Sequence, residues 1–417
     1  MVQLELLTKM KVHPSSLAEF KDMLANPEKE FKNKVEDDSS QIIKIRKNLI
    51  LGFPADATGC GFIRCRDPLN YLNSIYEKPG ILHTAVTPFF TFQSNILLRC
   101  KTLFFQRQMG PEHLEVIKKY KENQEQFKYS MTWDLDDFIF SGSNEGESIP
   151  EYNFGKENVN EPVVKSAIEI MNLMDLVTVS TDFLGAYLKE TVKIKPPVKT
   201  INNTVRMAYW GSYRKQPITE KIQKPKLLIS SSPTHYHTVK KLRGDFENSW
   251  TEYLLKNIKD NKIDVLFMGC TVTQEGKTEA PFFMKEVEGK ENFHKIGWLN
   301  SCQYHLPIIH YKPDFGVGPL VPNYFNYSKS CIKFQENCAC GSAFIGTIFR
   351  NGMPSPYDVS KIKMFDTCSV KDIEEIIEYH CYPEHYNSVI QEQYKWLNDS
   401  GSWLESKKYV DLLCSTF

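Results

Sequence analysis

Residues 314–347 read DFGVGPLVPNYFNYSKSCIKFQENCACGSAFIGT and carry the densest structural pattern in the chain. Two runs of small and apolar residues, 314–320 and 343–347, predict β-strands, and the residues between them predict a helix over 330–340. A helix that joins two strands in this way is typical of parallel strands in one sheet. We therefore expect a parallel α/β sheet in this part of the chain.

The same alternation of strands and helices runs through the rest of the sequence. The other predicted strands are 42–53, 102–106, 129–133, 176–180, 226–231, 263–269 and 294–298. The other predicted helices include 114–127, 162–174 and 250–257. We predict the α/β class, with two Rossmann-like domains whose parallel sheets face a central cleft. The expected divisions are an N-terminal extension at 1–40, a Rossmann-like domain at 41–195, a basic connection at 196–225, a second Rossmann-like domain at 226–388, and a C-terminal helix at 389–417 that packs back on the first domain.

Composition excludes several classes of protein. The 417 residues include 51 basic and 51 acidic side chains, so net charge gives no reason to expect a protein that coats a polyanion. An apolar fraction of 41% excludes a disordered or fibrous chain. No apolar run approaches the roughly 18 residues that span a bilayer, and residues 1–11 lack the apolar core of a secretory signal. We expect a cytoplasmic protein that has no membrane partner.

The cysteines and histidines do not form a clear metal-binding pattern. Eleven cysteines in a chain without a secretory signal predict reduced thiols. The nearest approach to a zinc box is His380–Cys381 with His385, whereas such boxes normally supply two ligand pairs. We interpret these residues as a helix end stopped by Pro383, and we predict neither a metal nor a cofactor.

Ligands of open α/β sheets bind beyond the carboxyl ends of the strands, so the residues after each strand are site candidates. The turn TGCG brings Gly59 and Gly61 after the first strand, where backbone amides and a helix start suit a phosphate. A tight turn without a ligand is the alternative. In the second half, the strand that starts at Lys226 leads into Ser232, Thr234 and His235.

The DLD sequence at 134–136 also follows a predicted strand, and it allows two interpretations. A D-x-D sequence at a strand end is how single-domain sugar transferases hold a divalent metal against a diphosphate. The alternative is an acidic cap on the next element. The choice between them separates two folds.

The helix predicted over 330–340 carries the strongest site candidates. Lys329, Lys333 and Glu336 are four and three residues apart, so they lie near one helix face close to its N-terminus. Cations beside free helix amides suit a diphosphate. A solvated lysine face is the alternative, but the small-residue strand that follows favours a buried site.

Residues 314–347 resemble the donor-binding segment of GT-B glycosyltransferases of the retaining, nucleotide-sugar-dependent kind. The shared pattern is close to D-x-G-x-x-P-L, F-N, K-S-x-x-K-x-x-E and A-x-G before a strand. The first half is similar to glycosyltransferases that tailed phages encode, in the sequences GCGFIR at 59–64, FQR at 105–107, WDLDD at 133–137, IPEYN at 149–153 and VTVST at 177–181. With SSPTH at 231–235, the resemblance extends from about residue 42 to 350.

The resemblance implies a GT-B fold, an acceptor domain followed by a nucleotide-sugar domain, and a donor that is a UDP-sugar. Its implied donor-binding residues are Gly59, Gly61, Ser232, Thr234, His235, Lys329, Ser330, Lys333 and Glu336. The glycines approach the phosphates, the lysines neutralise the diphosphate, and the glutamate accepts hydrogen bonds from ribose. Many relatives have a second acid eight residues before this glutamate, where this chain has Ser328, so the resemblance does not assign the sugar. Such enzymes use no bound metal, which leaves Asp136 as a candidate base for the acceptor hydroxyl.

The predicted acceptor depends on local charge and on the phage resemblance. Between Lys189 and Lys226, ten basic residues face two acidic ones, a net of +8. Such a segment beside a cleft suits duplex DNA, with Arg206, Trp210, Arg214 and Lys215 as the candidate contacts, whereas a solvated linker is the alternative. Transfer of glucose or a pentose such as arabinose to 5-hydroxymethylcytosine in phage DNA, in the host cytoplasm, is the predicted function. The alternatives are a surface glycan, a lipid-linked sugar or a protein as acceptor, and a catalytically silent DNA-binding module.

Overall fold

The computed structural model describes residues 47–56, 59–76, 82–87, 90–92, 94–140, 161–210, 214–231, 235–236, 244–246, 249–300 and 303–417. The predicted extension at 1–40 and the first part of the strand predicted at 42–53 lie outside the described residues. So do the IPEYN sequence at 149–153 and the two predicted donor contacts Ser232 and Thr234.

The N-terminal half contains a six-stranded sheet in the order β2-β1-β3-β4-β5-β6, with every pair parallel. Its strands are β1 (Leu49–Phe53), β2 (His83–Val86), β3 (Cys100–Gln106), β4 (Ser130–Leu135), β5 (Leu176–Val179) and β6 (Val198–Thr200). The chain winds outward in one direction from β1 to β2 and in the other from β3 to β6. The carboxyl ends of β1 and β3 therefore form a topological switch point, where such sheets bind ligands.

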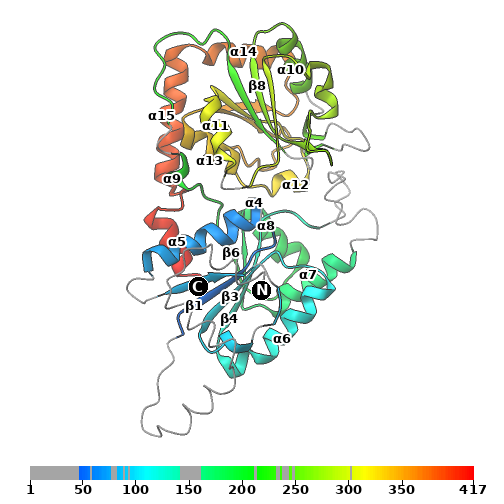
Figure 1. The fold of residues 1–417 in the computed structure, drawn as a ribbon, viewed down its shortest axis with the longest axis vertical. Coiled ribbons are helices and arrows are strands. Elements are labelled where there is room, and N and C mark those ends of the chain that lie inside the picture. The colour runs from blue at the N-terminus through cyan, green and yellow to red at the C-terminus, as the bar shows by residue number, and fades with distance from the viewer. Residues whose placement is uncertain are drawn as a thin grey trace. The chain divides into compact units, whose positions relative to one another are not determined.

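Helices cover both faces of this sheet because its strands are apolar on both sides. They are α4 (Gly59–Gly61), α5 (Asp67–Tyr76), α6 (Pro111–Phe127), α7 (Glu161–Leu173) and α8 (Asp182–Tyr187), with a π-helical turn, Phe62–Arg66, between α4 and α5. Leu103 and Phe105 pack with α6 and α7, whereas Phe104 between them packs with α5 and with α16 (Lys407–Cys414). Figure 1 shows α6 and α7 together on one side of the strands.

The C-terminal half contains a seven-stranded sheet in the order β10-β8-β7-β11-β12-β13, with β9 paired to β8. Its strands are β7 (Lys226–Ser230), β8 (Asp264–Val272), β9 (Thr278–Glu279), β10 (Phe293–Gly297), β11 (Phe315–Gly318), β12 (Ala343–Ile348) and β13 (Ile362–Phe365). Only the β8–β9 pair is antiparallel among the described strands. Numbered from β7 and without β9, the order is 3-2-1-4-5-6 of the Rossmann fold, with its switch point between β7 and β11.

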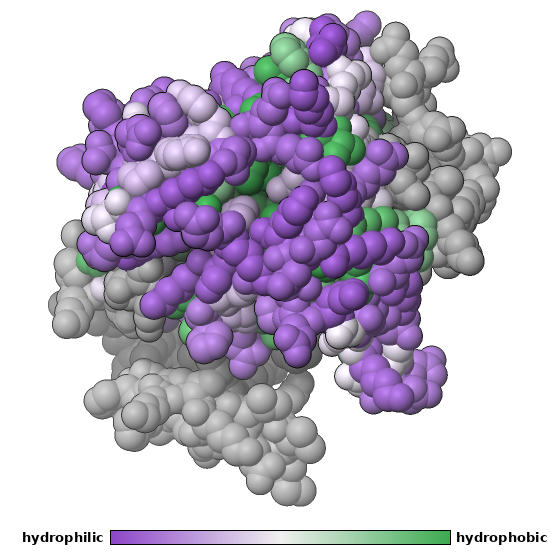
Figure 2. Space-filling model, turned by 90° about the horizontal axis from the view of Figure 1, so that it is seen from above, coloured by the Kyte–Doolittle hydropathy of each residue, from purple (hydrophilic) through white to green (hydrophobic). Residues whose placement is uncertain are grey.

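The helices of this half are α9 (Met207–Trp210), α10 (Trp250–Lys259), α11 (His305–Tyr311), α12 (Tyr324–Tyr327), α13 (Ile332–Cys340), α14 (Val370–His380) and α15 (Pro383–Ser400). Leu227 and Ile229 pack with α10 and α14, and Leu228 packs on the opposite face with α11 and α13. The surface in Figure 2 is mainly hydrophilic, with hydrophobic side chains visible in recesses. Among the described helices none is long and apolar enough to cross a membrane.

Several element limits differ from those predicted. The segment 196–225 was expected to be a connection, but Val198–Thr200 forms β6 and completes the N-terminal sheet. The expected limit at 388/389 falls inside α15, and the chain crosses to the N-terminal sheet only after Gly401, where α16 packs on β1 and β3. The short strands β2, β6 and β13 escaped prediction because segments of three or four partly exposed residues carry little periodic signal.

The ten described cysteines are free, as expected for reduced thiols. The suggested helix end at His380 is also present, since α14 ends there. The Nδ1 atom of His380 lies 2.9 Å from the carbonyl oxygen of Ile376, and the ring of His385 stacks on Tyr379. His380 therefore contacts its own helix, and His385, at the start of α15, contacts the end of α14.

Candidate active site

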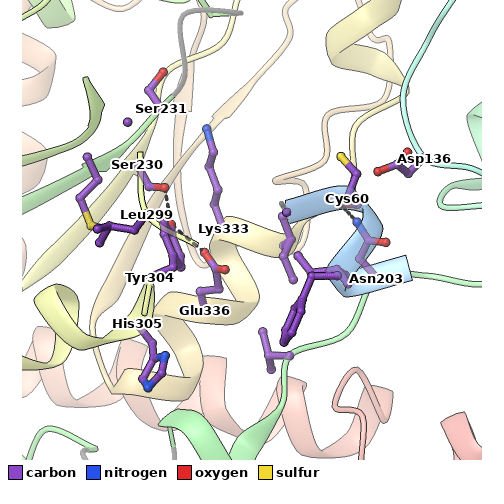
Figure 3. Close-up of a pocket in the computed structure, with 18 of the residues that line it drawn as sticks. Cys60, Asp136, Asn203, Ser230, Ser231, Leu299, Tyr304, His305, Lys333 and Glu336 are labelled. Carbon is purple, nitrogen blue, oxygen red and sulfur yellow. Dashed lines mark hydrogen bonds between the residues drawn. The ribbon is translucent and has the colours of Figure 1, made fainter. Parts of the chain in front are cut away.

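A cavity of about 310 Å³ is lined by residues that follow strands of both sheets, β1 and β7 among them. The N-terminal half contributes Gly59, Cys60 and Asp136, and the C-terminal half contributes Ser230, Ser231, His235 and the start of α13. Figure 3 shows Lys333 and Glu336 on α13, between Ser230 on one side and Cys60 and Asp136 on the other. The predicted cleft between two Rossmann-like halves is therefore present.

The start of α13 brings the predicted donor residues into this cavity. Lys329, Ser330, Lys333 and Glu336 all line it. The side chain of Cys331, at the N-cap position, makes no capping hydrogen bond, so the first amides of the helix keep their capacity to bind an anion. Lys333 and Glu336 lie one turn apart on the same face, as the spacing predicted.

His235 is buried and held in one tautomer by a carboxylate that sequence analysis missed. Its Nδ1 atom lies 2.5 Å from Oδ2 of Asp245, and its Nε2 atom lies 3.4 Å from Nζ of Lys333. Burial, followed by Lys333 and Lys329, lowers the pKa of His235 to about 3. A neutral ring has one N–H, which it donates to the carboxylate, so Nε2 accepts from the lysine. Asp245 is itself fixed by hydrogen bonds from the amide of Val321 and the side chain of Asn326.

Lys333 and Glu336, the two ionisable cavity residues on α13, each have a pKa close to 7. Removal from bulk water, followed by the charge of Lys329, lowers the pKa of Lys333 to about 7. Removal from water also raises the pKa of Glu336 to about 7, although the hydroxyl of Tyr304 donates to this carboxyl at 3.2 Å. Tyr304 is hydrogen-bonded to Ser230 as well, as the dashed lines of Figure 3 show. A bound anion would therefore favour the charged form of Lys333.

The glycine turn contributes one of its two predicted residues to the cavity. Gly59 lines it, and a Cβ atom there would have no neighbour within 4 Å. Gly61 is not a lining residue. Its amide donates to Oδ1 of Asp56 at 3.2 Å, and a Cβ atom would lie 2.0 Å from the carbonyl oxygen of the same residue. Gly61 is thus required by the turn itself.

The two ends of the D-x-D sequence have different environments. Asp134 is fully buried, pairs with Arg64 at 2.5 Å and does not line the cavity, so its role is structural. Asp136 lines the cavity, and its burial, followed by the neighbouring Asp137, raises its pKa to about 6. Arg107 lies 3.7 Å from Asp136 and 3.1 Å from Asp137, and so supplies positive charge at this wall.

Cys60, Asp136 and Asp137 form the only group of possible metal ligands that the described residues contain. Their ligand atoms lie within 4.8 Å of one another. Burial, followed by the charges of the two aspartates, raises the pKa of the Cys60 thiol well above its usual value, which disfavours the thiolate that binds metal. The expectation that no metal takes part stays a prediction.

Of the four residues predicted to contact DNA, Arg206 and Trp210 line the cavity, and Arg214 and Lys215 do not. Arg206 lines the cavity and pairs with Asp67 at 2.8 Å, and Trp210 is only 4% exposed. Arg214 and Lys215 lie outside the cavity lining: Arg214 stacks 3.5 Å from the ring centre of Tyr394, and Lys215 pairs with Asp314. The local excess of positive charge is thus partly balanced by carboxylates from distant parts of the sequence.

Sequence analysis missed several cavity residues, among them Ser231, Asn203, Tyr304 and Trp298. Ser231 follows β7 directly, and its buried hydroxyl has no hydrogen-bond partner among the described residues. Its position beside the predicted Ser232 was a usable signal. Asn203 lies in the basic segment, where only basic and aromatic side chains were proposed as contacts, and Tyr304 lies in a segment with no site pattern. Trp298, at the carboxyl end of β10, is 57% exposed.

No protein-family model and no curated protein sequence matches the chain. Two solved structures that match the chain do so over almost the full length of the solved protein. The sucrose-phosphate synthase of Thermosynechococcus elongatus is 12% identical, with a TM-score of 0.52 over 89% of this chain and 98% of the other. HepE of Anabaena, solved with UDP and glucose, is 9% identical, with a TM-score of 0.52 over 88% of this chain and 99% of the other.

These neighbours are GT-B glycosyltransferases, and the chain has the GT-B fold. A further structure, an alpha-glucosyltransferase solved with UDP and a 13-mer DNA, is 11% identical, with a TM-score of 0.49 over 84% of this chain and 94% of the other. That degree of likeness carries no inference about the acceptor. At these identities the comparisons establish the fold alone.

Proposed function

We propose that the chain is a glycosyltransferase that takes a sugar from a nucleotide-sugar donor, with UDP as the leaving group. The observation that carries this proposal is the start of α13, where Lys329 and Lys333 flank free helix amides in the cavity. A sugar diphosphate needs such neutralisation when its glycosidic bond breaks, because negative charge then develops on the leaving phosphate. UDP and glucose are bound by HepE of Anabaena, whose fold this chain shares.

The proposal assigns the donor to the cavity wall formed by the C-terminal half. It assigns the acceptor to the opposite wall, formed by Asp136 and Asp137 of the N-terminal half and called the acceptor wall below. Lys329 and Lys333 bind the diphosphate, His235 borders the donor and accepts a hydrogen bond from Lys333, and Glu336 accepts hydrogen bonds from the ribose hydroxyls. Asp136, on the opposite wall, takes the proton of the acceptor hydroxyl; with a pKa of about 6 it is mainly ionised at neutral pH. We propose that transfer proceeds with retention at the sugar carbon and without a bound metal, since Arg107 already pairs with the acidic wall.

The proposed acceptor is 5-hydroxymethylcytosine in DNA, and this part rests on the sequence resemblance to phage glycosyltransferases. A flipped base would reach the cavity, and carboxylates such as Asp136 and Asp137 can accept from the exocyclic amine of cytosine. The same carboxylates would accept from the hydroxyls of a sugar. A glycan, a lipid-linked sugar or a protein is therefore the alternative acceptor.

The test is transfer of label from UDP-glucose and UDP-arabinose to two duplexes that differ only in one 5-hydroxymethylcytosine, each with and without EDTA. Label on the modified duplex alone, unaffected by EDTA, would support the donor, the acceptor and the absence of metal. Hydrolysis of the donor without label on DNA would move the acceptor to a glycan, lipid or protein. Failure to bind any nucleotide sugar would contradict the enzyme proposal and leave a silent GT-B module. NMR of the product anomer decides between retention and inversion.

A further inference from the structure

Asn203 joins the two walls of the cavity. It lies between β6 and α9, lines the cavity and is 8% exposed. Its Oδ1 atom accepts from Nη1 of Arg64 at 3.0 Å, and its Nδ2 atom donates to Oγ of Ser330 at 2.8 Å. Its carbonyl oxygen accepts from Nε2 of Gln335 at 3.0 Å. One residue thus connects the helical segment after β1 with the donor-binding segment at α13.

Chemistry fixes the direction of these hydrogen bonds. A guanidinium only donates, so the amide oxygen of Asn203 must face Arg64 and its NH₂ group must face Ser330. Arg64 is in turn anchored by Asp134, at 3.0 Å from Nε to Oδ2 and 2.5 Å from Nη2 to Oδ1. Thr178 also donates to Asp134, at 2.6 Å, and all of these side chains except Ser330 are buried. Asp134 thus holds Arg64 in place, and the two hydrogen bonds beyond it run in one direction, from Arg64 to Asn203 and from Asn203 to Ser330.

This polarity decides what Ser330 can do. Its oxygen accepts from Asn203, so its own O–H is left to donate, and its side chain has no other hydrogen-bond partner among the described residues. Ser330 lines the cavity directly after Lys329 and ahead of α13. A donated proton at that place meets the same anion that the lysines neutralise.

A second contact holds the same segment against the N-terminal sheet. The hydroxyl of Thr181, at the start of α8, donates to the carbonyl oxygen of Ser328 at 2.9 Å. The donor-binding segment is therefore attached to the other half of the molecule on both sides of Lys329. Its distance from the acceptor wall depends on these contacts.

We propose that Asn203 is a positioning residue that turns the Ser330 hydroxyl proton toward the donor diphosphate and fixes the donor-binding segment at the acceptor wall. The proposal rests on the proposed function, because it requires a nucleoside diphosphate in the cavity. It identifies the diphosphate, and not the base or ribose, as the part of the donor that Asn203 affects.

The test uses Asn203→Asp, which keeps the shape and the acceptor for Arg64 but replaces the donor to Ser330 by a second acceptor. The Ser330 proton would then turn away from the cavity. Asn202→Asp is the matched control: it adds the same charge one residue earlier, on an exposed side chain that does not line the cavity. Affinities for UDP and for uridine are measured by NMR titration, with thermal unfolding of each variant followed by circular dichroism.

We expect Asn203→Asp to weaken UDP binding about tenfold, the effect of one hydrogen bond to a charged oxygen, and to leave uridine binding unchanged. Ser330→Ala should give the same loss, and the double variant no further loss, because both changes remove one hydrogen bond. This second variant keeps the test valid if Asn203→Asp folds poorly.

Three results would overturn the inference alone: UDP binding of Asn203→Asp equal to that of Asn202→Asp, additive losses in the double variant, or equal losses for uridine and UDP. If the folded, unaltered chain bound no nucleoside diphosphate, the proposed function would fail and this inference with it. The two failures are thus distinguishable in one set of titrations.

Discussion

Donor affinity should fall as pH rises through 7, because the lysine that faces the diphosphate loses its proton. In the free protein, removal from water and the charge of Lys329 hold the pKa of Lys333 at about 7. A bound diphosphate favours the protonated form and raises that pKa. Binding is therefore strongest below pH 7, where the lysine is already charged, and above pH 7 it requires uptake of a proton.

The size of the effect follows from the protonated fraction. A group with a pKa of about 7 is about half protonated at pH 7 and about 3% protonated at pH 8.5, so affinity should fall about 15-fold over this range. His235 does not contribute, since its pKa of about 3 keeps it neutral throughout. Glu336 also titrates in this range, with a pKa of about 7. Asp245, on the far side of His235 from Lys333, is the other carboxylate whose charge acts on the lysine.

The assay is calorimetric titration with a nucleotide sugar, since the terminal phosphate of UDP itself titrates near pH 6. Two buffers of different ionisation enthalpy report proton uptake, which should approach about one proton at pH 8.5. Lys333→Arg keeps the charge at every pH and should abolish the slope. Glu336→Gln removes the second titrating group and should leave the slope in place. A flat affinity in the unaltered protein, or an equal slope in Lys333→Arg, would refute the reasoning.

Three further predictions concern the other wall and the core. Asp136→Asn should lower the transfer rate about 100-fold or more while donor affinity stays within about twofold. The transfer rate of the unaltered protein should rise through about pH 6 to a plateau, as this carboxyl loses its proton. A loss of donor affinity as large as the loss of rate would instead place this residue in the donor site. Arg64→Leu should cost about 3–5 kcal/mol in urea unfolding, because it leaves Asp134 buried without its partner, and a loss below about 1 kcal/mol would contradict that role. Trp210→Ala should lower the free energy of unfolding in urea by about 3–5 kcal/mol, since the ring is buried. An unchanged stability together with weaker DNA binding would instead support the predicted contact of Trp210 with bases.

The fold could be predicted because strands buried on both faces are runs of apolar and small residues in sequence, and β7, β8, β11 and β12 are buried over most of their length. Part of the donor-binding face could be predicted for a similar reason: the spacing of Lys333 and Glu336 places their side chains together on α13, whereas Lys329 lies before the helix, which starts at Ile332 and not at the predicted residue 330. Both inferences depend only on local periodicity.

The remaining site residues depend on contacts between distant segments. His235 was named from its position after β7, but its tautomer depends on Asp245, which carried no signal of its own. Asn203 lies 139 residues from Arg64 and 127 from Ser330, so no local pattern relates them. The charge of the segment 196–225 was counted without Asp67 and Asp314, the carboxylates that pair with Arg206 and Lys215.

The central claim is that the start of α13 binds the diphosphate of a sugar donor, and nucleotide release tests it most directly. The unaltered chain and Lys333→Met would each be incubated with UDP-, ADP- and GDP-sugars, and the released nucleoside diphosphate measured. We predict that the unaltered chain releases UDP from at least one UDP-sugar and that the variant loses most of this activity while remaining folded. Release from no donor, or equal release by both proteins, would contradict the account.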